Sequence, residues 1–440
     1  MIRKSFTGLA LLLFTTLAVF SQAPGPAPAQ TRVIVVGSAK SAYPAATPTP
    51  VKLVVTDNLP ASRPAPTPLP RPLPAQTPSM LGNPSLPAPT PTPDYYSQTS
   101  FKSLSFSQIK NKIAEAKRQM QSRPMPTAMT DAFLITDFVR IAFYDWKTQQ
   151  IDYLVMTKDA FLSTKFDSAV MSTNGKLITV HTIRGNGVNT PVVLRDGTNQ
   201  FHLPLLVQYP VEKGGRYTET AYYMSTHPGL VTPEVVSAGK LYVRNTIEIA
   251  RDRLREKGII IQPKIADMAE RLALVEHVDH LRFRTEYHPN IYNDVFTLYA
   301  LNEGQTYRYS VSSAGAGGMV QMIPSTYRMI RGRYFNVNLM PDFVEGMRNH
   351  INASQAMLLY MQMTWDDLVA SPTVSNALFN KIATPEQLMA AGYNSNPAKL
   401  AGYINRGGAG WTNLIPRETQ IYLQIFDSIE RFVPMTPRTR

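Results

Sequence analysis

The chain reads NEGQTYRYSVSSAGAGGMVQMIPSTY between residues 302 and 327, and this stretch decides what kind of domain the C-terminal part forms. The apolar run VFTLYALNEG at 295–304 predicts a helix that delivers one acid, Glu303, at its C-terminal end. A carboxylate beside apolar walls loses hydration, which raises its pKa toward the working pH of a general acid. Glu303 is therefore predicted to be a proton donor, and the alternative is a solvated charge at a helix end.

The residues after Glu303 favour a site over a surface charge. Three glycines between residues 315 and 318 allow a tight backbone turn, and Gln321 then interrupts an apolar segment. An amide in that position can direct hydrogen-bond donors into a cleft.

This stretch resembles the catalytic motif of the soluble lytic transglycosylases, relatives of goose-type lysozyme. Their pattern, E-S-x-F-x-x-x-A-x-S-x-x-G-A-x-G-L-x-Q-x-x-P-x-T, fits here without a gap. The resemblance implies that Glu303 is the catalytic acid and that Ser312 and Gln321 bind the substrate. The chain departs from the pattern at three places, where the usual Ser, aromatic residue and Ala are replaced by Gly304, Thr306 and Ser310.

Three later stretches resemble further motifs of the same family, in the same order. They are HINASQAMLLYMQ (350–362), AAGYNSNPAKLAGYI (390–404) and IPRETQIYLQIF (415–426). The resemblance implies that Tyr393 and Asn394 face the sugar cleft and that Glu418 is a second cleft carboxylate. Taken singly, Tyr393 fits a packed aromatic residue, Asn394 a turn or cap, and Glu418 a first-turn acid at a helix N-terminus.

The sequence predicts an α+β multidomain protein in four parts. Residues 1–29 have the basic start, apolar stretch and A-x-A site of a secretory signal peptide. Residues 30–98 form a disordered Pro-rich spacer, because proline fixes φ and lacks a donor. Residues 99–240 form a β-rich antiparallel domain of unknown role, and residues 241–440 a mostly α-helical, lysozyme-like domain.

Local patterns support this division. Two β-like islands lie in the spacer at 31–37 and 51–57, where they could add strands to a partner or to the later domain. A short polar helix is predicted at 106–121. Beyond it, short runs of Val, Ile, Thr and aromatic residues alternate with Gly, Asn and Asp turns, which is typical of an antiparallel domain. No catalytic motif occurs in that domain, so an adaptor, dimerisation or binding role is expected.

Composition narrows the class of partner. The formal net charge of +13 suits a polyanionic surface such as a cell-wall polymer, and export favours the wall over nucleic acid. Because the chain has no cysteine, disulfides and a lipid-modified cysteine are excluded. A metal site at His277, His280 and His288 is the weaker interpretation, because no second ligand cluster completes a tetrahedral set. No metal or other cofactor is expected.

The family resemblance implies a peptidoglycan lytic transglycosylase. Such an enzyme uses one Glu as acid and base to cut the bond between N-acetylmuramic acid and N-acetylglucosamine, leaving 1,6-anhydro ends, and the substrate's N-acetyl group replaces a second carboxylate. Two alternatives stay open, namely a lysozyme-type hydrolase and an exported wall-binding or scaffold protein whose site has decayed. The expected location is the periplasm or cell envelope, or secretion from the cell. The expected partners are glycan strands and a cell-envelope protein bound through the β-rich domain or the spacer.

Overall fold

The computed structural model describes residues 31–36, 51–56, 101–123 and 136–439. The signal peptide predicted at 1–29 and most of the spacer predicted at 30–98 lie outside the described residues. The chain divides into two compact units, Met1–Pro84 and Ser85–Arg440.

The described part of the first unit is one pair of strands. β1 (Thr31–Val36) and β2 (Val51–Thr56) are rich in β-branched residues, which favour extended backbone. They pair antiparallel with each other in one register, Thr31 opposite Thr56. The two β-like islands of the sequence are therefore strands, and each is the other's partner.

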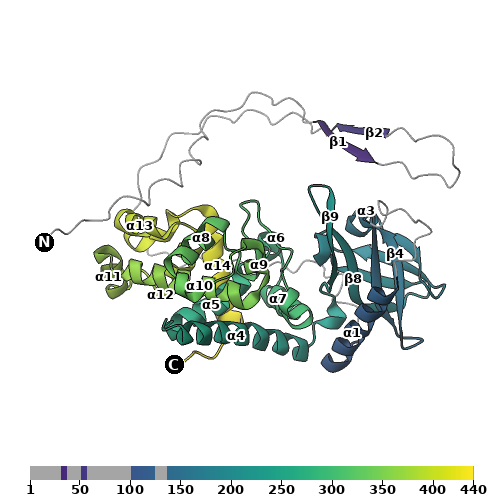
Figure 1. Ribbon diagram of the computed structural model, residues 1–440, viewed down its shortest axis with the longest axis horizontal. Coiled ribbons are helices and arrows are strands. Elements are labelled where there is room, and N and C mark those ends of the chain that lie inside the picture. Colours follow the sequence, from purple (N-terminus) through teal and green to yellow (C-terminus); the bar gives the residue numbers. More distant parts are fainter. Residues whose placement is uncertain (1–30, 37–50, 57–100, 124–135, 440) are drawn as a thin grey trace, which may run out of the picture. The chain divides into compact units, whose positions relative to one another are not determined.

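The second unit begins with a helix and an antiparallel sheet, which confirms the β-rich region predicted from the alternating pattern (Figure 1). The strand order is β4-β3-β8-β7-β6-β5, and β9 pairs with the C-terminal part of the long strand β8, in a barrel-like arrangement. Glycines at positive φ, Gly214 and Gly215, make the turn between β8 and β9. The strand bounds are β3 (Phe138–Asp145), β4 (Gln150–Thr157), β5 (Ser168–Met171), β6 (Leu177–Thr182), β7 (Val192–Asp196), β8 (Phe201–Lys213) and β9 (Arg216–Tyr223).

Helix α1 (Phe106–Ser122) confirms the helix predicted at 106–121 and packs on this sheet (Figure 1). Its apolar residues share one buried cluster with residues of β3 and β8. Arg140 of β3 links the end of the helix to the sheet. Its guanidinium donates to the carbonyl of Met120 in α1 at 2.5 Å and to the side chain of Gln208 in β8 at 2.8 Å. A short helix, α3 (Lys158–Leu162), follows β4.

A mostly helical region follows the sheet, as predicted. Its first helix, α4, begins at Pro233, capped by the side chain of Thr232, seven residues before the domain boundary expected at residue 240. The helices are α4 (Pro233–Glu256), α5 (Pro263–Val275), α6 (His280–Thr285), α7 (His288–Asn302), α8 (Pro324–Arg333), α9 (Phe343–Arg348), α10 (His350–Val369), α11 (Pro372–Phe379), α12 (Pro385–Asn394), α13 (Leu400–Gly407) and α14 (Arg417–Phe432).

Close packing holds these helices together. α10 is buried along most of its length and contacts α4, α5, α8, α9, α11 and α12. α4 and α7 approach so closely at Gly239 that a Cβ there would lie 1.9 Å from the carbonyl oxygen of Phe296. Among the helices described, none is long and apolar enough to cross a membrane.

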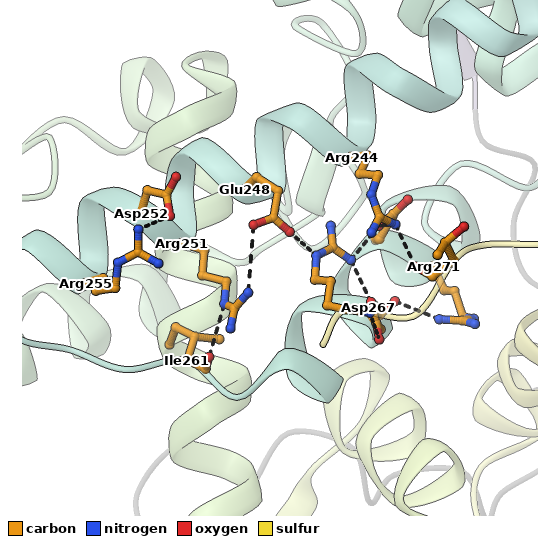
Figure 2. A network of polar contacts seen from close by, with 11 residues as sticks. Arg244, Glu248, Arg251, Asp252, Arg255, Ile261, Asp267 and Arg271 are labelled. Carbon is orange, nitrogen blue, oxygen red and sulfur yellow. Dashed lines mark hydrogen bonds and ion pairs between the residues drawn. The ribbon is translucent and has the colours of Figure 1, made fainter. Parts of the chain in front are cut away.

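The residues after α14 return to α4 and α5 through a network of charges (Figure 2). Arg438 is only 3% exposed and pairs with Asp267 at 2.8 Å, with Glu270 at 2.6 Å and with Glu248. Arg244 of α4 donates to the carbonyl of Thr436 at 2.9 Å. One buried guanidinium thus bridges three carboxylates from two helices and fixes the C-terminal segment against them.

Candidate active site

The structure places Glu303 at the surface. It caps the C-terminus of α7 at a positive φ of 45°, its side chain is 55% exposed, and it forms an ion pair with Lys110 of α1. The preceding residue, Asn302, turns inward instead, because its side-chain amide exchanges two 2.9 Å hydrogen bonds with the backbone of Met224. The helix end was predicted correctly, but the apolar walls expected around Glu303 are not found.

The glycine-rich loop forms the tight turn that the sequence predicted. Gly315 and Gly318 have φ of 77° and 68°, and a Cβ at Gly318 would lie 2.3 Å from the carbonyl oxygen of Met347. Gln321 adopts a left-handed backbone and donates its amide to the carbonyl of Gly318 at 2.8 Å. Ser312 is exposed, and its hydroxyl accepts from the Ala316 backbone at 3.0 Å. Both side chains therefore brace the loop.

Tyr393 forms a hydrogen bond to this loop, and Asn394 forms one to the start of α14. The hydroxyl of Tyr393 donates to the carbonyl of Val320, beside Gln321, at 2.7 Å. Asn394, the last residue of α12, accepts a hydrogen bond from the hydroxyl of Thr419 at 2.8 Å. Glu418 lies in the first turn of α14 and is exposed. The motif segments that are separated in sequence are thus neighbours in the fold.

The carboxyl group among these segments is that of Glu276. This residue follows the apolar run LALV and caps the C-terminus of α5. The hydroxyl of Tyr422, on α14, donates to its Oε1 atom at 2.6 Å. Burial raises the pKa of Glu276 to about 8, the nearby charge of Glu418 adds to the rise, and the bond from Tyr422 opposes it.

Tyr393 and Tyr422 both lie within the electrostatic reach of Glu276. Burial raises the pKa of each phenol well above its usual value, and the Glu276 carboxylate raises both further. Both phenols therefore keep their protons at neutral pH. Each can act as a hydrogen-bond donor beside the carboxyl group.

His277 connects the end of α5 to the glycine-rich loop. Its Nε2 donates to the carbonyl of Met319 at 3.0 Å, and burial lowers its pKa to about 3, so the ring is neutral. His288 bonds instead to Ser428 and to the carbonyl of Phe283. Within the described ranges, no three His, Cys, Asp or Glu side chains gather to hold a metal ion. These two histidines are occupied in holding the fold together.

Glu276 also lines a cavity of about 870 Å³. Its other walls come from α6, α7, the start of the glycine-rich stretch at Ser310, and the β-rich region. The Oε2 atom of Glu276 makes no hydrogen bond to the described residues, and the residue as a whole is partly exposed. A partly buried carboxyl group at a cavity wall, with one oxygen fixed and the other unpaired, has the properties of a proton donor.

Comparison of the chain with protein-family models, curated proteins and solved structures found no match. A function for this chain therefore rests on the four ordered motifs and on the geometry around Glu276.

Proposed function

We propose that this chain is an exported peptidoglycan lytic transglycosylase whose acid and base is Glu276. The observation that carries the proposal is a partly buried carboxyl group, bonded to Tyr422, where the glycine-rich loop, the Tyr393 helix and the Tyr422 helix meet, and its burial raises its pKa. The family resemblance implied Glu303 for this role. The solvent exposure of Glu303 and its pairing with Lys110 favour Glu276 instead.

The proposed reaction begins with the proton of Glu276. Because Tyr422 donates to Oε1, the acidic proton is expected on the unpaired Oε2. Oε2 gives this proton to the glycosidic oxygen between N-acetylmuramic acid and N-acetylglucosamine as the bond from that oxygen to the muramoyl C1 breaks. The substrate's own N-acetyl group stabilises the positive charge that develops at C1, so no second protein carboxylate is needed.

The second half of the reaction returns the proton. Glu276, now a carboxylate, removes the proton of the muramoyl C6 hydroxyl, whose oxygen bonds to C1 and closes a 1,6-anhydro ring. The acid is regenerated and no water is consumed. A pKa of about 8 suits both steps, since a group near the working pH donates and accepts with similar ease.

The remaining predicted residues have positioning roles in this proposal. The hydroxyl of Tyr393 is bonded to the Gln321 loop, and Asn394 lies beside the start of α14, but neither Gln321, Tyr393 nor Asn394 is among the described residues that line the cavity. Glu418 acts through its charge, which helps to keep the proton on Glu276. Binding of sugars by Ser312, Gln321, Tyr393, Asn394 and Glu418 stays a prediction.

The proposed setting is the cell envelope. The N-terminal sequence pattern supports export to the periplasm or secretion, and the net charge of +13 supports attraction to a polyanionic wall. Glycan strands are the proposed substrate and partner. A cell-envelope protein bound through the spacer or the β-rich region stays a further proposal.

Analysis of products from purified peptidoglycan tests this function. We expect the wild-type protein to release muropeptides with 1,6-anhydro ends, which are lighter by one water than the hydrolysed equivalents, and Glu276→Gln to release none. Reducing ends would identify a lysozyme-type hydrolase. Binding to the wall without release of fragments would identify a wall-binding protein and refute the enzymatic proposal.

A further inference from the structure

The cavity beside Glu276 has walls from both halves of the second unit. Arg184, Tyr209 and Tyr223 come from the β-rich region, whereas Glu276 and Tyr309 come from the helical region. The two regions are joined here by direct bonds, such as the 2.7 Å ion pair between Arg348 and Glu219. The β-rich region, which carries no catalytic motif, thus reaches the proposed proton donor.

Arg184 is the unusual group in this cavity. Its guanidinium is partly buried, and burial lowers its pKa, with the charge of Arg282 adding to the effect. Within the part of the chain that the structure describes, it makes no hydrogen bond or ion pair. A guanidinium stays charged at any physiological pH, and a partly desolvated guanidinium without hydrogen-bond acceptors is costly. Such a group favours binding of an anion.

The carboxylates nearest to Arg184 are already bound to other groups. Asp294 and Glu286 both accept hydrogen bonds from Arg282, at 2.7 Å and 2.7 to 2.9 Å. Asp279 caps α6 by accepting from the backbone of Leu281 and Arg282. The charges of all three raise the pKa of Arg184, but none of the three accepts a hydrogen bond from it, so its N–H groups stay available for a ligand.

The loop that carries Arg184 is held in place by its own hydrogen bonds. The backbone of Ile183 bonds to the carbonyl of Pro191 at 3.0 Å, and the backbone of Asn186 donates to the hydroxyl of Thr190 at 2.8 Å. A Cβ at Gly185 would lie 2.4 Å from the carbonyl oxygen of Leu162, so the loop lies close against the end of α3. Arg184 is therefore presented to the cavity from a braced loop, which lowers the entropic cost of binding.

We propose that Arg184 binds a carboxylate of the peptidoglycan strand while Glu276 acts on the glycosidic bond, an inference that rests on the proposed function. Arginine pairs with a carboxylate through two parallel N–H···O bonds, which fixes both the position and the orientation of the ligand. Peptidoglycan offers such a carboxylate on its peptide stem and, once the stem is removed, on the lactyl group of N-acetylmuramic acid. The β-rich region is then a subsite that selects the strand to be cut.

Cleavage of two substrates by matched variants tests this inference. One substrate is glycan strands with peptide stems, and the other is the same strands after an amidase has removed the stems. Arg184→Gln removes the charge, Arg184→Lys keeps it, and Arg216→Gln removes a charge from the exposed hairpin of the same region, outside the cavity. Circular dichroism confirms that each variant is folded.

We expect Arg184→Gln to lower kcat/KM by about 10- to 100-fold, the loss typical of one charged hydrogen-bonding partner. Arg184→Lys should recover part of the loss, and Arg216→Gln should match the wild type. A loss on stem-bearing strands alone assigns the stem carboxylate, and a loss on stripped strands assigns the lactyl carboxylate. Unchanged cleavage of both substrates, or an equal loss in Arg216→Gln, overturns the inference.

A binding measurement separates this inference from the proposed function. If the wild-type protein cleaves neither substrate, the proposed function fails. Calorimetric titration with the free stem peptide and, separately, with N-acetylmuramic acid then decides about Arg184. Binding of either carboxylate by the wild type but not by Arg184→Gln supports the anion site, and absence of binding of both by the wild type overturns it.

Discussion

The substitution Glu276→Gln should make the stability of the protein less dependent on pH. The carboxyl group has a pKa of about 8 in the folded protein and 4.5 as its reference value. Because the folded pKa is the higher one, the stabilising effect of the bound proton is fully present below pH 4.5 and is lost as the pH rises through about 8. Glutamine keeps the shape and an oxygen for Tyr422 to donate to, but has no proton to lose.

The size of the effect follows from the pKa shift. At about 1.4 kcal/mol per pKa unit, ionisation of Glu276 lowers the free energy of unfolding by on the order of 4 kcal/mol between pH 5 and pH 9. Partial solvent access makes this an upper value. The assay is guanidinium unfolding of both proteins, followed by the helical circular dichroism signal at several pH values. Glu276→Gln should be less stable than, or equal to, the wild type at pH 5 and clearly more stable at pH 9, and parallel pH profiles would refute the raised pKa.

Three further substitutions test the contacts around and behind the site. Tyr422→Phe removes the hydrogen bond that lowers the pKa of Glu276, so the alkaline limb of the pH profile of kcat/KM should move to higher pH. An alkaline limb that stays in place or moves to lower pH would contradict the assigned contact. Arg438→Ala leaves three carboxylates without their shared partner and should lower the free energy of unfolding by about 3–5 kcal/mol. The control Arg255→Ala breaks only the exposed Arg255–Asp252 pair (Figure 2) and should lower it by less than about 1 kcal/mol. Gly239→Ala forces α4 and α7 apart and should cost about 3 kcal/mol by the same denaturation assay, and a neutral result would show that the two helices are not this close.

Much of the fold could be predicted from local patterns. Short runs of Val, Ile, Thr and aromatic residues between Gly, Asn and Asp turns predicted the antiparallel region, and local patterns also predicted α1 and the end of α7 before Glu303. These features depend on backbone preferences of a few neighbouring residues, which the sequence displays directly. The start of α4 was harder to place, because its cap is Thr232 followed by Pro233, a helix start that precedes the clear apolar repeat.

The identity of the candidate acid could not be predicted from spacing. Glu276 follows LALV and Glu303 follows VFTLYALN, so both residues end an apolar helix. The ungapped fit to the family pattern favoured Glu303, since α6 and α7 lie between Glu276 and the glycine-rich loop. Which helix end enters the site depends on tertiary contacts, namely the bonds of Tyr422 to Glu276 and of His277 to Met319. The sequence signal for Glu276 is its place at the end of the apolar run LALV, directly before His277.

The β-rich region illustrates the same limit. Its strands were recognisable one by one, but nothing in their sequence indicated that the loop with Arg184 would lie in the same cavity as Glu276. That proximity arises from the docking of the sheet on α7, through bonds such as those between Asn302 and Met224. Residues that meet only across such an interface carry no common sequence pattern.

The most direct test compares the two candidate acids in one assay. Equal amounts of the wild type, Glu276→Gln and Glu303→Gln digest purified peptidoglycan at pH 7, and the initial rate of muropeptide release is measured by mass spectrometry. Loss of a general acid typically costs about 10²- to 10⁴-fold, so Glu276→Gln should fall by that factor, while Glu303→Gln should stay close to the wild type. A fully active Glu276→Gln together with an inactive Glu303→Gln would contradict the assignment.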